Sequence, residues 1–284
     1  GGYGYDTTDL AASKYRLQKL GVDRVIILTD VGQFPHFDLI FRGSFIAGWA
    51  VEGKHRLDHM GFGLIQNDKG GKMATREGGN IKLMELLDEA KARAKDQIVE
   101  RLKENAQGED KVETATSTTK LTEAEMDEAA EVMGIDAVKY FDLNQNRIQN
   151  YKFSYEKMLS PKGNTAVYLL YSYARINSII EKSGIEVDKL KNAANVKITD
   201  DYETVILAHV AKFCEVILGV ADELNLNRLC AYLYEFSGII ASGYKKYKIL
   251  GNEHTLHRVQ ILYVARMVFD QCFFLLGLKP LKKI

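Results

Sequence analysis

The chain has 284 residues, which is enough for two domains with separate hydrophobic cores. Apolar residues make up 46% of it and charged residues 27%, as in an ordinary soluble protein, and no apolar run reaches membrane-spanning length, so we expect no membrane association. Basic and acidic residues balance at 38 each, so composition argues neither for nor against nucleic acid, which needs only a locally basic face.

Cysteine usage argues against a metal site. Cys214, Cys230 and Cys272 have no metal-ligand spacing, and their number is odd. Their apolar helical surroundings predict buried thiols in a reducing compartment. The N-terminus shows neither a signal peptide nor a transit peptide. We therefore expect a cytoplasmic protein without a bound metal.

The first motif, GGYGYDTTDLAA, predicts a loop that runs into a helix over residues 7–20. Thr7 or Thr8 is expected to cap the first turn, and Asp9 suits its positive dipole end. Tyr5 precedes Asp9 by four residues, so the phenol and the carboxylate face one pocket if this turn is helical. The simpler interpretation, that these polar side chains only cap a helix, stays open.

The second motif, RVIILTDVGQFPHF, predicts a parallel strand followed by a helix with Pro35 near its first position. Gln33 then lies at the carboxyl end of the strand, where open α/β sheets bind their ligands. His36 follows one helical turn later and either reaches the same pocket or is a partly buried structural histidine. A tyrosine, a carboxylate and a carboxamide around one strand end suit a cationic ligand with many donors.

Two glycine-containing motifs follow. RLDHMGFG, residues 56–63, predicts a short strand whose glycines let another group approach the backbone closely. NDKGGKMATREGGN, residues 67–80, predicts a loop around a polar centre. A strand bend and a plain surface hairpin are the alternative interpretations.

The remainder of the chain is predominantly helical. We expect a helix over residues 81–106, a solvated linker from 105 to about 122, and a new helix that starts at the capping box TEAE, residues 122–125. From about residue 155, apolar residues at three- and four-residue intervals predict a bundle of four or more helices. The fold class is therefore an α/β part followed by an all-α part.

The order of these motifs resembles the second half of the catalytic domain of arginyl-tRNA synthetases, a class I family. The resemblance is carried by YDTTDLAA, GQ-x-x-HF, LDHMGFG, GKMATREG, YFDLNQNRIQNYKFSYEKMLSPKGNTAVYLLYSYARI and LLGLKPLKKI, and it covers essentially the whole chain. It implies the second half of a Rossmann-type catalytic domain with stem over residues 1–152. An α-helical anticodon-binding domain is implied over residues 153–284.

The resemblance also implies a reaction: ATP-dependent activation of L-arginine to arginyl-adenylate and transfer to tRNA(Arg). ATP with Mg²⁺ is then a substrate, and neither a tightly bound cofactor nor a covalent catalytic residue is expected. Asp9 would bind the guanidinium of arginine, with Tyr5, Gln33 and His36 beside it. The implied ATP-binding residues are His59, Gly61, Phe62 and Gly63, together with the divergent KMSKS-like loop Lys72, Met73, Ala74, Thr75 and Arg76.

Tyrosine is frequent in the helical half, and some of these rings must belong to the core. By position in their motifs, Tyr168, Tyr171, Tyr244 and Tyr247 resemble family tyrosines near the anticodon arm of tRNA. Aromatic rings stack on unpaired bases, and Lys245 and Lys246 would contact phosphates. The resemblance therefore implies an RNA-binding face on the bundle.

The sequence contains no HIGH-type motif and no first Rossmann half. We therefore expect the isolated chain to be an inactive monomer whose partner is the missing N-terminal half of the catalytic domain. Its incomplete sheet should expose an apolar edge and face. A non-catalytic tRNA-binding or assembly module is the alternative function. A cysteinyl sister enzyme is disfavoured because no zinc-type cluster is present.

Overall fold

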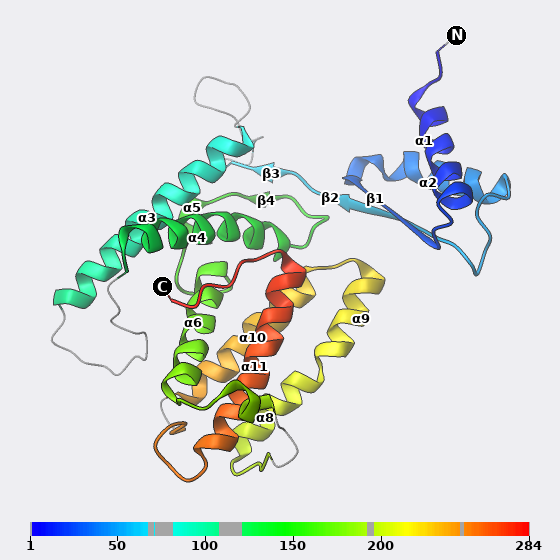
Figure 1. Ribbon diagram of the computed structural model, residues 1–284. Coiled ribbons are helices and arrows are strands. Elements are labelled where there is room, and N and C mark those ends of the chain that lie inside the picture. Colours follow the sequence, from blue (N-terminus) through cyan, green and yellow to red (C-terminus); the bar gives the residue numbers. More distant parts are fainter. Residues whose placement is uncertain are drawn as a thin grey trace. The chain divides into compact units, whose positions relative to one another are not determined.

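The computed structural model describes residues 2–67, 71, 82–107, 121–191, 196–244 and 247–283. The chain folds into two compact units. Unit 1 consists of residues 1–73 and 146–153, and unit 2 consists of residues 74–145 and 154–284 (Figure 1). These units are defined by packing, and the domain boundary between residues 152 and 153 stays a prediction.

Unit 1 is a small α/β unit. Its elements are α1 (Tyr5–Lys14), the π-helical turn η1 (Tyr15–Lys19), β1 (Arg24–Asp30), the 3-10 turn η2 (Val31–Gln33), α2 (Phe34–Ile46), β2 (Arg56–Phe62), β3 (Ile65–Gln66) and β4 (Tyr151–Lys152). Strand β1 pairs in parallel with β2, and β3 pairs in parallel with β4. The predicted strand, the following helix and the position of Pro35 in its first turn are confirmed.

The first helix begins earlier than the sequence suggested. Helix α1 starts at Tyr5 with Gly4 as its N-cap, and no side chain caps it. Thr8 lies inside the helix, where its Oγ1 donates to the carbonyl oxygen of Tyr5 at 2.7 Å. The predicted threonine cap is therefore wrong, because within a helix a threonine hydroxyl can bond back to a preceding carbonyl instead.

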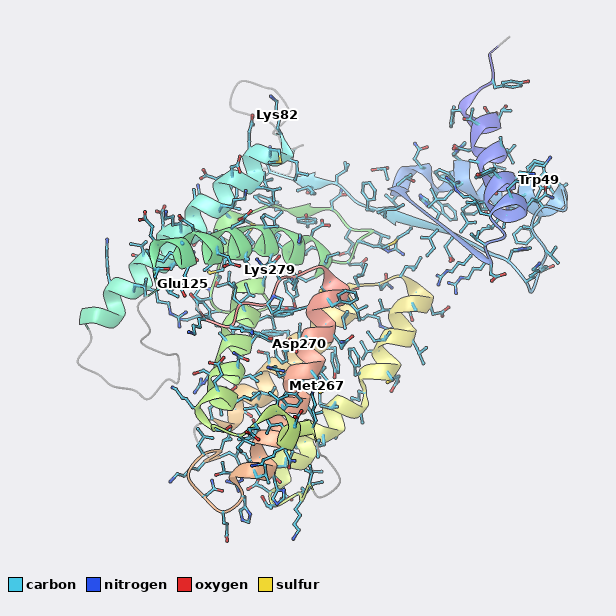
Figure 2. All side chains as sticks on the ribbon, viewed as in Figure 1. Trp49, Lys82, Glu125, Met267, Asp270 and Lys279 are labelled. Atoms are coloured by element: carbon cyan, nitrogen blue, oxygen red, sulfur yellow. The ribbon has the colours of Figure 1, made fainter. Side chains whose placement is uncertain are left out.

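Strand β1 is buried on one face only. Val25 belongs to a small core with Leu17 and Ala50, against which Trp49, labelled in Figure 2, also packs. Successive side chains of a strand alternate between faces, and Ile26 and Leu28 on the opposite face are 45% and 59% exposed. The predicted exposed apolar face is confirmed.

The regular elements among the described residues of unit 2 are all helices. Its helices are α3 (Leu83–Gln107), α4 (Glu123–Leu143), α5 (Tyr155–Met158), α6 (Ala166–Lys182), α7 (Val187–Lys191), α8 (Asp201–Ala211), α9 (Phe213–Glu223), α10 (Asn227–Gly243) and α11 (Thr255–Leu276). Figure 1 shows α6, α8, α10 and α11 alongside one another. Phe236, Phe269 and Phe273 are fully buried in the core of this bundle. The predicted helical bundle is confirmed.

Helices α3 and α4 pack closely. The start of α4 is the predicted capping box, in which Thr122 Oγ1 accepts from Glu125 N while Thr122 N donates to Glu125 Oε2 at 2.8 Å. At Gly134 a Cβ atom would lie 2.6 Å from the Lys91 backbone nitrogen, so glycine permits the close approach. Most of the predicted linker lies outside the described residues.

The C-terminal tail lies on α4. The backbone N–H of Lys279, labelled in Figure 2, donates to Asp136 Oδ2 at 2.7 Å. Lys139 Nζ donates to the Gly277 carbonyl at 2.7 Å. Burial raises the pKa of Asp136 to about 6 despite these neighbours.

The cysteine prediction holds for two of the three thiols. Cys230 and Cys272 are buried, and burial raises the pKa of each to about 12. Cys214 is exposed on α9, so its predicted burial is wrong. The reason is that the apolar side chains around Cys214 in sequence are themselves only partly covered, and no residue of α9 is buried.

Two helical stretches of the described chain have the length and hydropathy of membrane spans, Asp201–Glu223 and Thr255–Leu276. The second is 61% buried inside the bundle, as a core helix is, whereas the first is 11% buried. Length and hydropathy alone carry little weight, because core helices of soluble proteins also satisfy them. The absence of membrane association stays a prediction.

Candidate active site and RNA interface

Asp9 and His36 form a hydrogen-bonded pair beyond the carboxyl end of β1. Asp9 Oδ2 on α1 lies 2.7 Å from His36 Nε2 in the first turn of α2. The Tyr5 and His36 rings lie 4.6 Å apart between centroids. The helical turn from Tyr5 to Asp9 therefore brings the phenol and the carboxylate to one place, as the spacing predicted, and His36 joins them.

This cluster is accessible at its carboxylate. The side chain of His36 is 14% exposed and that of Asp9 is 37% exposed. A carboxylate has about four acceptor positions, and the contact with His36 uses one of them. Asp9 can therefore still accept from a planar group with several N–H donors.

Gln33 is the last residue of η2, directly after β1, and it is exposed. Asp30 fixes this turn, because its Oδ1 accepts from Gly32 N at 2.7 Å. Gln33 thus lies at the strand end where the sequence placed it. Its contact with a ligand stays a prediction.

His59 on β2 is held by two neighbours. Its Nε2 lies 2.8 Å from Thr29 Oγ1, and its ring stacks on Phe37 with centroids 5.3 Å apart. Burial lowers the pKa of His59, and the Arg147 guanidinium lowers it further. Both effects favour the neutral ring, and the two contacts fix its orientation.

The glycines beside it make close contacts inside the protein. A Cβ atom at Gly63 would lie 2.5 Å from the Gln149 carbonyl oxygen, and one at Gly61 would lie 3.0 Å from Val31 Cα. The predicted close approach of another group is therefore present, and at Gly63 that group is backbone of the same unit. The Phe62 side chain between them is 41% exposed.

The residues of the predicted KMSKS-like loop, Lys72, Met73, Ala74, Thr75 and Arg76, lie outside the described residues. Their role stays a prediction.

Arg147, which the motifs did not single out, reaches the strand end: its Nη1 donates to the Gly61 carbonyl at 2.7 Å. No local sequence pattern marks this contact, because the two residues are 86 positions apart.

On unit 2, Tyr168 lies against another tyrosine. The rings of Tyr168 and Tyr234 meet edge to face with centroids 5.5 Å apart. Tyr168 is half-buried, and Tyr234 is 37% exposed. The pair therefore offers aromatic surface on the bundle, in contrast to Tyr173 and Tyr232, which are buried in the core.

Two other predicted tyrosines carry a guanidinium on one ring face. Arg101 lies 3.8 Å over the Tyr171 ring, and Arg175 lies 3.8 Å over the Tyr244 ring. Burial raises the pKa of Tyr244, whose hydroxyl has no hydrogen-bond partner among the described residues. The stacked arginines place positive charge beside these rings.

Tyr247 belongs to a buried cluster around Glu203. The Tyr247 hydroxyl donates to Glu203, and so does the Thr199 backbone N–H at 2.5 Å. Burial alone would raise the pKa of Glu203, but the hydrogen bonds from Tyr247 and Thr199 together lower it. The Arg258 guanidinium lies 4.1 Å over the Tyr247 ring. Tyr247 therefore anchors its segment to α8, and base stacking by it stays a prediction.

Lys245 and Lys246 lie outside the described residues.

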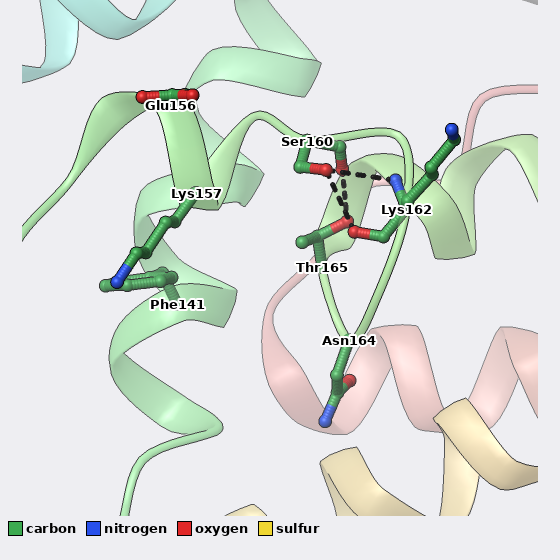
Figure 3. A pocket seen from close by; sticks show the side chains of 7 residues that line it. All are labelled: Phe141, Glu156, Lys157, Ser160, Lys162, Asn164 and Thr165. Atoms are coloured by element: carbon green, nitrogen blue, oxygen red, sulfur yellow. Dashed lines mark hydrogen bonds between the residues drawn. The ribbon is translucent and has the colours of Figure 1, made fainter.

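A separate surface pocket of about 410 Å³ lies at the start of α6 (Figure 3). Its lining residues are Phe141, Glu156, Lys157, Ser160, Lys162, Asn164 and Thr165. Thr165 caps α6, and Figure 3 shows the side chains of Lys157 and Lys162 pointing in different directions. The pocket contains none of the predicted site residues.

The sequence matches two known families. Residues 1–155 match the family described as class I tRNA synthetases (R), catalytic domain. Residues 169–284 match the DALR anticodon-binding domain. Together the two matches account for the α/β unit, helices α3 and α4, and most of the bundle.

The curated relatives are arginine–tRNA ligases. The chloroplastic/mitochondrial enzyme of Arabidopsis thaliana is 38% identical over all of this chain and 42% of its own length. The cytoplasmic enzyme of the same plant is also 38% identical, over 46% of its length. The enzyme of Nostoc sp. is 45% identical over 84% of this chain and 38% of its own length. The chain thus spans less than half the length of these relatives.

Solved structures agree. The arginyl-tRNA synthetase of Plasmodium falciparum matches with a TM-score of 0.81 and 32% identity, over all of this chain and 45% of its own. The Thermus thermophilus enzyme shares the fold, with a TM-score of 0.80 at 18% identity over all of this chain and 50% of its own. With these likenesses and the match of more than half its residues to the catalytic-domain family, the chain belongs to the class I arginyl-tRNA synthetase family.

Proposed function

We propose that this chain is the C-terminal part of an arginine–tRNA ligase, which activates L-arginine with ATP and transfers it to tRNA(Arg). The observation that carries the proposal is the Asp9–His36 pair with Tyr5 beside it. A pure tRNA-binding or assembly module has no need of an accessible carboxylate oriented in this way.

Asp9 binds the guanidinium of the substrate in this proposal. A hydrogen bond to a charged group contributes about 1.5–3 kcal/mol, and a bidentate pair separates arginine from lysine by geometry. His36 fixes the carboxylate, the Tyr5 ring packs beside the substrate, and Gln33 accepts from it. Acceptors that a wrong amino acid leaves unpaired reject it without editing.

ATP, with Mg²⁺, binds on the neighbouring strand end, beside His59 and the Gly61–Gly63 backbone. Lys72, Met73, Ala74, Thr75 and Arg76 close over the triphosphate. Class I chemistry needs reactants held in line and charge stabilised at the phosphate. No side chain then acts as a nucleophile, because the substrate carboxylate attacks the α-phosphate and pyrophosphate leaves.

The bundle binds the anticodon arm of tRNA(Arg) through Tyr168, Tyr171, Tyr244 and Tyr247, with Lys245 and Lys246 on phosphates. The stacked arginines beside Tyr171 and Tyr244 support this assignment, since they add positive charge to an aromatic face. We further propose a cytoplasmic monomer that works with the N-terminal half of the catalytic domain.

The test is arginylation of tRNA with the chain alone and with the chain joined to an N-terminal catalytic half from a relative. We expect no activity from the chain alone and arginine-specific activity from the joined protein. The chain alone should still bind tRNA weakly, with an affinity that falls as salt is added because counterions are released from phosphates. Salt-sensitive tRNA binding without arginylation by the joined protein would favour the non-catalytic module.

A further inference from the structure

The segment Asn146–Phe153 crosses the carboxyl end of β2, and we name it the strap. It directly follows residues 74–145 of unit 2 in the chain, and it belongs to unit 1. Arg147 makes two contacts there: its Nη1 donates to the Gly61 carbonyl at 2.7 Å, and its own carbonyl accepts from Gly63 N at 2.7 Å. One residue therefore bonds to the backbone of both Gly61 and Gly63.

The remainder of the strap continues this pairing along the chain. Asn150 Oδ1 accepts from Leu64 N at 2.7 Å. Tyr151 N donates to the Leu64 carbonyl at 3.2 Å, and Phe153 N donates to the Gln66 carbonyl at 2.9 Å, within the parallel β3–β4 pair. The strap thus bonds to Gly61, Gly63, Leu64 and Gln66, the last of which directly precedes the loop motif of residues 67–80.

The strap packs closely against Gly63. At Gly63 any Cβ atom would meet the strap backbone at 2.5 to 2.9 Å, at Gln149 and Asn150. The side chain of Arg147 is only half-exposed. A flexible surface loop would not require a glycine opposite it, so the strap is a fixed part of the strand end.

We propose that Arg147 is a positioning residue for ATP, which acts by fixing the Gly61–Gly63 backbone against which the nucleotide binds. This inference rests on the proposed function. Backbone groups recognise a ligand only if their positions are set before binding, because ordering them on binding costs conformational entropy. Arg147 fixes this backbone before ATP binds. Because the Gly61–Gly63 backbone contacts ATP in the proposed function, a change of Arg147 should affect the KM for ATP and not that for arginine.

The experiment uses the joined protein and measures steady-state arginylation while ATP and arginine are varied separately. Arg147→Met should raise the KM for ATP by about tenfold and leave the KM for arginine within about twofold. Arg147→Lys keeps one donor and the charge, so it should recover part of the loss. Lys152→Met, an exposed change on the same strap, is the matched control and should change neither constant.

Thermal unfolding of each variant separates positioning from folding. If Arg147→Met does not fold, Asn150→Ala tests the same strap through its bond to Leu64 and should show the same selective effect on ATP. Equal changes in both KM values, or no change in either, would overturn the inference. A joined wild-type protein without any arginylation would instead overturn the proposed function.

Discussion

The Asp9 carboxylate and the His36 imidazole meet at 2.7 Å although 27 residues separate them along the chain. The contact ties α1 to α2 and leaves the carboxylate one defined orientation. Asp9 is accessible while His36 is mostly covered. The structure therefore presents an accessible carboxylate beside a covered histidine, and its contact with arginine stays a prediction.

Asp9→Asn in the joined protein should raise the KM for arginine by at least about tenfold and leave that for ATP nearly unchanged. The reason is that a charged hydrogen bond to the guanidinium is worth more than about 1.4 kcal/mol. Steady-state arginylation measures both constants. Asp6→Asn, in the first turn of the same helix, is the control and should have no effect. Unchanged arginine kinetics in Asp9→Asn would mean that Asp9 is structural only.

The Asp136 contact with the C-terminal tail should make stability depend on pH. The folded-state pKa is raised to about 6 from 3.8 by burial. The folded state then binds more protons in this range, so the Asp136 contribution falls as pH rises from about 4 to about 6, by about 3 kcal/mol in all. In Asp136→Asn the amide oxygen can still accept from Lys279 N, and no charge forms.

Chemical denaturation of wild type and Asp136→Asn across this pH range measures the effect as a difference. The two proteins should be similar near pH 4, and the variant should be the more stable near pH 7. Other carboxyl groups cancel in the comparison, since both proteins contain them. A difference that stays constant with pH would contradict the assignment.

Tyr168 and Tyr173 should separate RNA binding from folding. Tyr168→Ala should weaken tRNA binding by about 1–3 kcal/mol if the ring stacks on a base. Tyr173 is buried, and its hydroxyl donates to Asp270 at 2.7 Å, so Tyr173→Ala should lower stability by about 3–5 kcal/mol. Filter binding and thermal unfolding of both variants give the comparison. A stable Tyr168→Ala protein with normal tRNA affinity would remove Tyr168 from the interface.

Two glycine positions should respond in opposite directions. Gly134→Ala places a Cβ atom 2.6 Å from the Lys91 backbone nitrogen, so α3 and α4 must separate, at a cost of about 1–3 kcal/mol. Gly238 lies inside α10 with nothing within 4 Å, so Gly238→Ala should stabilise by up to about 1 kcal/mol through helix propensity. Denaturant unfolding measures the unfolding free energy of each variant relative to wild type. Equal effects would mean that the α3–α4 contact adapts without cost.

Helices and their local signals could be predicted because their causes lie within a few residues. The Thr122–Glu125 capping box is such a case: both partners are three positions apart, and the structure has the bonds that the motif implies. Tyr5 and Asp9 likewise share a face because they are four residues apart in one helix. The predicted start of the first helix at residue 7 is wrong, because α1 begins at Tyr5 and Thr8 bonds to a carbonyl inside it.

The sequence by itself determined the family, the order of an α/β part followed by a helical part, and the shared helix face of Tyr5 and Asp9. That Tyr5, Asp9, Gln33 and His36 bind arginine stays a prediction. Tertiary structure decided what each side chain meets. Tyr247 donates a hydrogen bond to Glu203, 44 positions away, and Arg147 donates one to the Gly61 carbonyl, 86 positions away. Cys214 is exposed because the side chains around it are only partly covered. The physical reason is that periodicity and capping depend on neighbours along the chain. Burial, ion pairing and steric contact depend on segments that only the fold brings together.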